Sequence, residues 1–187
     1  MIGDIGVQAF GGCTALITVT FPKMTEDIGR HAFAECTALT TVYYPEMVQD
    51  IGAAAFLGCT SLRTATFSKM TGTVGSQAFR GCTSLTTIRF PERIELVDSE
   101  AFAQCTSLTN IECPKMSGTL ADRAFSECTA LTTVTFPMLS GSIATAAFVA
   151  CTALTTVTFP NMVKNIGENA FLGCTALRTA TFPREEA

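Results

Sequence analysis

A 23-residue step organises this chain of 187 residues, because one cysteine returns at every step. The eight cysteines in this register are Cys13, Cys36, Cys59, Cys82, Cys105, Cys128, Cys151 and Cys174. Phenylalanine keeps the same step from Phe10 to Phe171, and leucine from Leu16 to Leu177, without insertion or deletion. A unit of this length cannot enclose a core alone, whereas stacked units cover one another's apolar residues and bury a continuous core. The recurrence therefore predicts a solenoid of eight 23-residue coils.

Composition supports a packed repeat array and argues against several classes of protein. Apolar residues make up 48% of the chain and charged residues 15%, which favours a buried core over disorder. The 12 lysines and arginines are scattered and the formal net charge is −4, so no face that binds nucleic acid is expected. No apolar run approaches the roughly 18 residues of a membrane span. Residues Met1 to Phe10 lack the basic start and apolar stretch of a secretory signal.

The segment L-x-x-V-x-F of each unit has the alternation of a β-strand. In the first coil, Val19 and Phe21 alternate with Thr18 and Thr20, which point to the other face. A proline, which has no N–H to donate, follows these segments and fits the end of a strand, with Ser68 in its place in one coil. The prolines are Pro22, Pro45, Pro91, Pro114, Pro137, Pro160 and Pro183. Strands in constant register predict one parallel sheet along the solenoid, with a spacing of about 4.8 Å.

The rest of the unit predicts a helical turn and a second, shorter strand. The segment A-F-x-x-C-T-x-L places apolar residues at i, i+1, i+4 and i+7, a spacing that favours one or two helical turns. The short strand is expected at the I-G step, at Ile5, Ile28, Ile51, Val74, Val97, Leu120, Ile143 and Ile166. Glycine follows in five of these eight coils, but Asp98, Ala121 and Ala144 follow in the others, so the step does not require a positive φ.

The complete unit, A-F-x-x-C-x-x-L-x-x-V-x-F-P followed by a loop and I-G, resembles the BspA-like (Treponema pallidum-type) class of leucine-rich repeats. The resemblance extends from about Ile2 to Pro183. It implies an α/β repeat solenoid, a right-handed superhelix with the parallel sheet on its concave face and short helical turns and short second strands on the others. Residues 1–187 are then one leucine-rich-repeat domain, with eight repeats over about 2–183 and a short polar tail at 184–187.

The resemblance also implies a function without catalysis. By this resemblance the chain is similar to surface or secreted adhesion and interaction modules, mostly bacterial, that bind host proteins, matrix proteins or other cells. The class has no shared catalytic residue and no cofactor, so neither is expected here. The parent protein is accordingly expected at the cell surface or outside the cell, while the missing signal leaves a cytoplasmic location open.

The phased cysteines admit three interpretations. Each occupies a position where a small apolar residue would face inward, which favours a ladder of buried free thiols. Neighbouring coils also bring equivalent Cα atoms near the separation of a disulfide, whereas structural zinc needs close pairs of the kind C-x-x-C that this chain lacks. Cys113 breaks the phase and replaces the inward aromatic of the other coils, so it predicts a tolerated core substitution with a local void, or alternatively a reactive thiol.

Two other residue types have a structural and a functional interpretation. The single histidine, His31, is expected to face solvent without a nucleophile beside it. Methionines recur at Met24, Met47, Met70, Met116 and Met162, with Arg93 and Leu139 at the other two places. A core ladder under the loop is the favoured interpretation, and a methionine-rich binding groove is the alternative.

The outward strand positions carry the candidate binding residues. Threonine occupies most of them, which suits a solvated sheet because β-branched residues pack well across strands. The departures from threonine are Tyr43, Arg89, Asn110 and Glu112, and Arg63 lies beside them. Tyrosine and arginine are enriched in binding hot spots, so these five residues form the candidate ligand surface, with random variation on a solvated face as the alternative.

Three functions compete on these observations. The first is an interaction module that binds a protein or glycan partner through the concave sheet. The second is a structural spacer or self-assembling segment, because both end coils lack a polar cap and can stack end to end on another copy. The third is an ice-binding surface made of the Thr-x-Thr strands, which the interruptions at Tyr43, Arg89 and Glu112 argue against.

Overall fold

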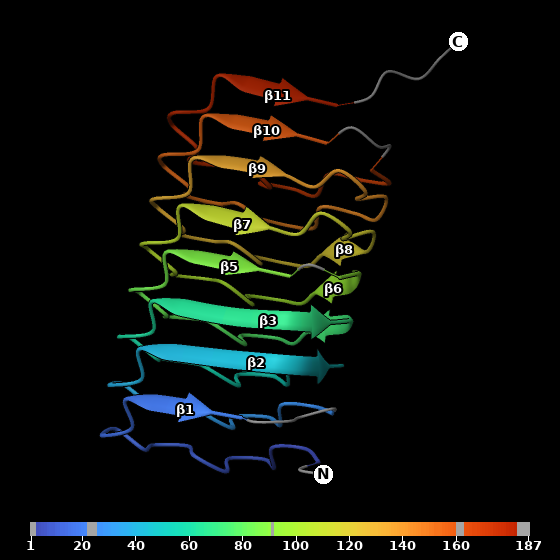
Figure 1. Ribbon diagram of the computed structural model, residues 1–187. Coiled ribbons are helices and arrows are strands. Elements are labelled where there is room, and N and C mark those ends of the chain that lie inside the picture. Colours follow the sequence, from blue (N-terminus) through green and yellow to red (C-terminus); the bar gives the residue numbers. More distant parts are fainter. Residues whose placement is uncertain (1–2, 22–25, 91, 160–162, 183–187) are drawn as a thin grey trace.

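The chain forms a β-solenoid in which successive coils stack with their strands side by side (Figure 1). The computed structural model describes residues 3–21, 26–90, 92–159 and 163–182. One long face carries the strands β1 (Thr18–Thr20), β2 (Thr41–Val48), β3 (Thr64–Met70), β5 (Thr87–Arg89), β7 (Asn110–Glu112), β9 (Thr133–Thr135), β10 (Thr156–Thr158) and β11 (Thr179–Thr181). The step from Thr18 to Thr41 recurs at each of these strands as far as Thr179, so the coils keep the spacing of the sequence repeat.

The strands of the long face are parallel and in the predicted register. Thr18 pairs with Thr41, and Thr64 pairs with Thr87, each one repeat further along the chain. The pairing forms two sheets, a five-stranded one with the order β1-β2-β3-β5-β7 and a three-stranded one with the order β11-β10-β9. The sequence predicted one continuous sheet, so the interruption between β7 and β9 is a correction to that expectation.

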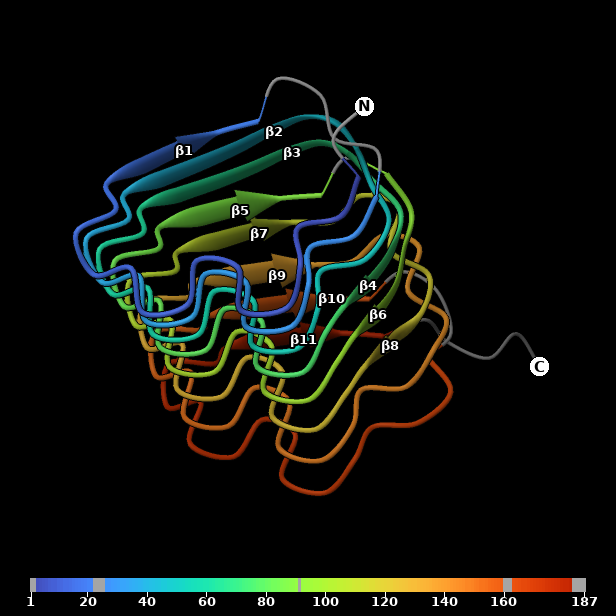
Figure 2. The same cartoon turned by 90° about the horizontal axis from the view of Figure 1, so that it is seen from below.

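A second face carries the short strands that the I-G step predicted. They are β4 (Gly72–Val74), β6 (Ile94–Val97) and β8 (Thr119–Leu120), which form a three-stranded parallel sheet. In the other coils the same step makes single parallel bridges, such as the bridge between Ile5 and Ile28. Viewed along the solenoid, β4, β6 and β8 lie at one side of the coil and the long strands at another (Figure 2).

The expected helical turns are wrong, because the described residues contain no helix and the fold is therefore all-β rather than α/β. The segments between each short strand and the next long strand, here called the turn face, contain two residues per coil with left-handed backbone. In one coil these are Ala54, with φ 54°, and Gly58, with φ 68°. Such residues interrupt a right-handed helix. The amides bond across coils instead, as Phe33 N–H does to the carbonyl oxygen of Ala55 at 2.7 Å.

Two columns of aromatic rings fill the core between the faces. On the side of the turn face, rings one repeat apart stack from Phe10 to Phe171 with centroids 5.0–5.3 Å apart. On the side of the long sheet a second column begins with Phe21 and Tyr44, whose ring centroids are 5.1 Å apart. The first column is continuous and the second is interrupted only at Cys113, so the repeat solves nearly the same packing problem in each coil, as the sequence predicted.

The phased cysteines form the predicted ladder of buried free thiols. All nine cysteines lie in the described residues and are free. Cys36 through Cys151 are fully buried in this register, whereas Cys13 in the first coil is exposed and Cys174 in the last is half-buried. The Cys59 thiol donates a hydrogen bond to the carbonyl oxygen of Phe33 in the preceding coil at 3.1 Å, and the same bond recurs along the ladder.

The methionine column is a core ladder only in part. Met70, Met116 and Leu139 are fully buried. Arg93 is exposed, and Ile94, the residue after it, is buried instead. This one-residue shift accompanies a register irregularity between β4 and β6. Met24 and Met162 lie outside the described residues, as does the side chain of Met47.

The prolines follow the long strands as predicted at Pro114 and Pro137, since β7 ends at Glu112 and β9 at Thr135. Pro45 departs from that expectation because β2 continues through it to Val48. The ladder between β2 and β3 is irregular between Tyr44 and Met47, and such a bulge accommodates a residue without an N–H donor. Pro22, Pro91, Pro160 and Pro183 lie outside the described residues.

Candidate functional site

The outward positions of the long strands form one polar surface. Along β3, the side chains of Thr64 and Thr66 are exposed, whereas those of Ala65 and Phe67, which alternate with them, are buried. The same alternation holds in β5, β7 and β9. Strand geometry produces this surface, because successive side chains point to opposite faces of a sheet.

Four of the residues that face outward lie in a single row across neighbouring strands. Tyr43 of β2 pairs with Thr66 of β3, Thr66 pairs with Arg89 of β5, and Arg89 pairs with Glu112 of β7. Tyr43 is 49% exposed, which is unusual for a large aromatic side chain on this molecule. The row places an aromatic ring, a hydroxyl, a cation and an anion at consecutive steps of the solenoid.

Opposite charges meet at one end of this row. Arg89 Nε lies 3.2 Å from Glu112 Oε2, with both side chains more than half exposed. Asn110, on the same strand as Glu112, donates from Nδ2 to Glu112 Oε1 at 3.4 Å. An exposed pair of this kind contributes only about 0–1 kcal/mol to folding. The pair therefore contributes little to stability, and the side chains of Arg89 and Glu112 are exposed to solvent.

Two hollows in the surface flank the Arg89–Glu112 pair. The first, of about 340 Å³, lies between β7 and β9 and is lined by Arg89, Asn110, Ile111, Glu112, Cys113, Pro114, Thr133, Thr135 and Pro137. The second, of about 280 Å³, lies over β3 and β5 and is lined by Thr64, Ala65, Thr66, Thr87, Ile88, Arg89 and Glu112. Arg89 and Glu112 belong to both hollows, so this ion pair lies between them.

The structure brings together three of the five residues that the sequence proposed as a ligand surface. Arg89, Asn110 and Glu112 line one hollow. Tyr43 shares their face but lies two strands away from Arg89. Arg63 is exposed and precedes β3, and its amide donates to the carbonyl oxygen of Thr40 in the preceding coil. Arg63 lines neither hollow. The five residues are thus a surface rather than a single pocket.

The sequence did not predict the residues after β7 that line the larger hollow. Thr133, Thr135 and Pro137 line it, although in the sequence they look like ordinary members of the repeat. The only available signal was Cys113, whose small side chain predicted a local void. Cys113 belongs to the lining of this surface hollow, and a void in the core beside its side chain stays a prediction.

The buried thiols have little chemical reactivity. Burial raises the pKa of the Cys59 thiol from its ordinary value of 9.0 to about 12. Burial likewise raises the pKa of Cys113 far above that value, with a smaller contribution from the neighbouring carboxylate of Glu112. A thiol held neutral is a poor nucleophile and a poor metal ligand, so Cys113 is a structural residue of the hollow and not its reactive group.

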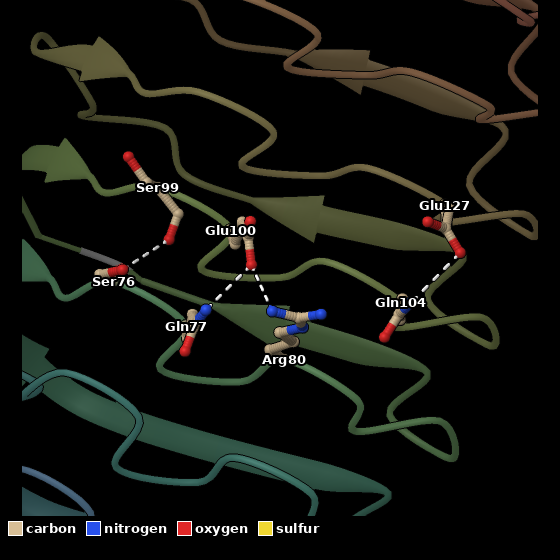
Figure 3. A network of polar contacts seen from close by, with 7 residues as sticks. All are labelled: Ser76, Gln77, Arg80, Ser99, Glu100, Gln104 and Glu127. Atoms are coloured by element: carbon tan, nitrogen blue, oxygen red, sulfur yellow. Dashed lines mark hydrogen bonds and ion pairs between the residues drawn. The ribbon is translucent and has the colours of Figure 1, made fainter.

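A second polar cluster lies on the turn face (Figure 3). Glu100 pairs with Arg80 Nη1 at 2.5 Å and accepts a hydrogen bond from Gln77 Nε2 at 3.0 Å. Gln104, in the same coil as Glu100, donates from Nε2 to Glu127 Oε2 of the next coil at 3.3 Å. These side chains satisfy one another between adjacent coils, so we interpret the cluster as a tie along the solenoid.

His31 also lies on the turn face, where it has left-handed backbone with φ 55°. The sequence placed its side chain in solvent, but His31 is half-buried and lines a hollow of about 370 Å³ together with Gln8 and Glu35. Within the described ranges, no three histidine, cysteine or acidic side chains are grouped to hold a metal ion. Those ranges also contain no helix long and apolar enough to cross a membrane.

Comparisons with known proteins agree with the coil geometry. The sequence matches the family model described as BspA type leucine rich repeat region (6 copies) over residues 2–105 and 72–186. Among solved structures, a leucine-rich repeat protein from Bacteroides ovatus has a TM-score of 0.71 at 23% identity, covering 94% of this chain and 51% of that one. The leucine-rich repeat protein of Treponema pallidum has a TM-score of 0.62 at 26% identity, covering 95% of this chain and 72% of that one.

The chain thus spans about half the length of the Bacteroides ovatus structure. Comparison with curated proteins found no match.

Proposed function

The chain belongs to the BspA-type leucine-rich repeat family, and from this premise we propose that it is a non-enzymatic module that binds a protein or glycan partner through the outward surface of its long sheet. Leucine-rich repeat proteins are typically protein-interaction modules. The sheet surface offers a partner an ordered array of side chains on a rigid stack of coils, since each strand is held in register by its neighbours. Rigid presentation limits the entropy lost on binding.

One observation carries the proposal. On a sheet whose outward positions are mostly threonine, the row Tyr43–Thr66–Arg89–Glu112 carries an aromatic ring and both charges beside two hollows. Binding hot spots are enriched in tyrosine and arginine and lie where a partner can displace water from a concave surface. The neighbouring outward positions on β9, β10 and β11 are all threonine and provide a natural comparison surface.

The test uses matched variants on the two parts of the sheet. Binding is measured on a glycan array and on immobilised extracellular-matrix proteins, for the wild type and for the double variant Tyr43→Ala, Arg89→Ala. The matched control, Thr158→Ala, Thr181→Ala, changes outward positions of β10 and β11. We expect the first variant to lose at least tenfold in affinity and the control to bind like the wild type, because one lost hot-spot side chain weakens binding by about 2 kcal/mol or more. Equal binding of all three proteins would reject the proposal.

A second candidate function is end-to-end assembly. Large apolar side chains are exposed on the first and last described coils, with Val7 67% and Ile17 60% exposed at one end and Leu172 59% exposed at the other. Uncovered apolar ends of a repeat array favour stacking on another copy. Sedimentation over a concentration series tests this function, since association through the ends increases the mean mass with concentration and a monomer at all concentrations contradicts it.

The threonine array is a weaker candidate for binding ice. Six outward threonines stay in register on β9, β10 and β11, where Thr133 pairs with Thr156 and Thr156 with Thr179. The array is only three strands wide before β7 presents Asn110 and Glu112. We therefore expect no thermal hysteresis, and a measurable activity would restore this function.

BspA-type proteins are typically surface proteins, and we propose the same location for the parent of this chain. Antibody labelling of intact cells, compared with permeabilised ones, tests the location. Signal that requires permeabilisation would contradict it.

A further inference from the structure

The aromatic column behind the long sheet has one gap. Phe67 and Phe90 stack at 5.5 Å, and Phe136 and Phe159 lie 6.2 Å apart. Between Phe90 and Phe136 the inward position belongs to Cys113, whose side chain is fully buried but too small to span the space of a ring. This coil therefore lacks a ring contact on the side of the long strands, while Phe102 keeps the turn-face column continuous.

The sheet is interrupted at the same coil. β5 pairs with β7, and β9 pairs with β10, but β7 and β9 belong to different sheets. At the beginning of these strands the Thr132 amide lies 3.5 Å from the carbonyl oxygen of Thr109. The equivalent bonds on either side are shorter, 3.0 Å from Thr109 to Thr86 and 2.8 Å from Thr155 to Thr132. The missing ring and the opened ladder thus coincide at one seam, which we define as the junction of β7 and β9.

The larger hollow lies at this seam. Its lining takes Arg89, Asn110 and Glu112 from one sheet and Thr133 and Thr135 from the other. At about 340 Å³ it is at the small end of ligand pockets, which range over roughly 300–1,000 Å³. That volume suits one ring-sized group rather than a long segment of chain. This hollow lies where the ladder between β7 and β9 is interrupted, whereas the hollow of about 280 Å³ lies over the paired strands β3 and β5.

The chemistry of the rim selects a neutral ligand rich in hydroxyl groups. Arg89 and Glu112 hold opposite charges 3.2 Å apart, so an anion would face the carboxylate of Glu112 and a cation would face the guanidinium of Arg89. A neutral group that both donates and accepts satisfies the two together, since guanidinium groups only donate and carboxylates only accept. Asn110 and the two threonine hydroxyls can each donate and accept. Pro114 adds an apolar wall.

We propose that the seam hollow binds a single hexose unit of a partner's glycan, a specificity that rests on the proposed binding function. Adjacent hydroxyls of a sugar ring accept from Arg89 and donate to Glu112, while the C–H face of the ring packs against Pro114. Neither step needs a metal or a covalent bond. Phenylalanine at position 113 would continue the aromatic column, close the seam and remove the hollow, so Cys113 is the residue that permits sugar binding without contacting the sugar's hydroxyls.

The experiment measures saturation-transfer NMR signals from the methyl glycosides of glucose, galactose, mannose and N-acetylglucosamine at millimolar concentration. We expect at least one of them to receive signal from the wild type, and we expect that signal to fall at least fivefold in Glu112→Ala and in Cys113→Phe. Thr158→Ala is the matched control and is expected to keep the signal. Because Cys113→Phe places a larger side chain in the core and can prevent folding, the exposed variant Glu112→Ala keeps the test decisive.

The outcomes separate this inference from the broader proposed function. Absence of signal from every glycoside with the wild type overturns the inference, as does undiminished signal in Glu112→Ala. A partner that binds equally well after enzymatic removal of its glycans also overturns it, and identifies a protein surface as the ligand, which leaves the proposed binding function intact. Signal that disappears in Glu112→Ala and persists in Tyr43→Ala supports the seam as the sugar site.

Discussion

The thiol of Cys82 donates a hydrogen bond to the carbonyl oxygen of Phe56, which lies 26 residues earlier in the chain, at a sulfur–oxygen distance of 3.1 Å. The same oxygen accepts the amide of Cys59 at 3.2 Å. Each phased cysteine from Cys36 onward thus ties its own coil to the preceding one while filling a small space in the core. This double role explains a cysteine rather than an alanine at the position, because alanine cannot donate.

Replacing one of these thiols should weaken folding measurably. Cys82→Ala removes both the hydrogen bond and the volume of a buried sulfur, and we expect the free energy of unfolding to fall by about 1–2 kcal/mol in urea denaturation. Cys13→Ala is the matched control, since Cys13 is exposed and belongs to the first coil. Its expected effect is within about 0.5 kcal/mol. Similar losses at both positions would refute a stabilising role for the bond.

Stability should decrease in alkaline solution. Burial raises the pKa of Cys59 from 9.0 to about 12 and raises that of Cys82 and Cys128 well above 9.0. Above pH 9 the unfolded chain releases these protons while the folded chain retains them, so the free energy of unfolding falls as pH rises. Each thiol contributes up to about 1.4 kcal/mol per pH unit in that window. Urea denaturation between pH 7 and pH 11 measures the slope, and Cys82→Ala should reduce it. A flat profile would contradict the burial of the thiols.

One buried hydroxyl should lower stability. The ring of Tyr44 is fully buried in a column where the other coils carry phenylalanine except at Cys113, and its hydroxyl has no hydrogen-bond partner among the described residues. Tyr44→Phe removes an unsatisfied polar group while keeping the ring, so we expect a gain of about 1–2 kcal/mol. The reverse change Phe67→Tyr, in the neighbouring coil, should lose a similar amount. Thermal unfolding of the two variants checks both signs, and a destabilised Tyr44→Phe would show that the hydroxyl is satisfied in solution.

The left-handed positions of the turn face should respond in opposite directions to paired substitutions. Gly81 has φ 72° and Ala150 has φ 58° at equivalent places in different coils. A side chain is disfavoured in this backbone region, so Gly81→Ala should destabilise by about 1 kcal/mol and Ala150→Gly should stabilise by about 0.5–1 kcal/mol. A Cβ at Gly81 would lie 3.8 Å from the nearest atom, which leaves backbone conformation as the cause. Chemical denaturation would contradict this account if Gly81→Ala were neutral.

Sequence reasoning reached the stacking and the strands but not the turns. The 23-residue step determines which side chains lie over one another, and the alternation around Val19 identifies the long strands, because both depend on packing that every coil repeats. The helical turns were wrongly predicted because the apolar spacing of the turn face also suits a helix. Gln8, His31 and Ala54 have left-handed backbone there although they are not glycine. No residue type marks such a position, so the inter-coil hydrogen bonds that stabilise it could not be anticipated.

The candidate site was also predictable only in part. Departures from threonine identified Arg89, Asn110 and Glu112, which line one hollow in the structure. The contribution of Thr133 and Thr135 depends on the separation of β7 and β9, a distance that no local pattern encodes. The sequence also did not predict that Ile94 rather than Arg93 occupies the buried position of its coil. The irregularity that causes this shift leaves the coil at 23 residues, so the sequence repeat gives no sign of it.

The central claim is that side chains one repeat apart in the sequence lie directly over one another, since the long sheet and its binding surface exist only in that case. A disulfide cross-link tests it most directly, because it forms only when the two Cα atoms are about 4.4–6.8 Å apart. Thr41 and Thr64 are exposed partners on adjacent strands, whereas Thr41 and Thr87 are two strands apart. The variant Thr41→Cys, Thr64→Cys should close an intramolecular disulfide on mild oxidation, detected by peptide mapping, while Thr41→Cys, Thr87→Cys should not. A cross-link in the second variant, or its absence in the first, would contradict the account.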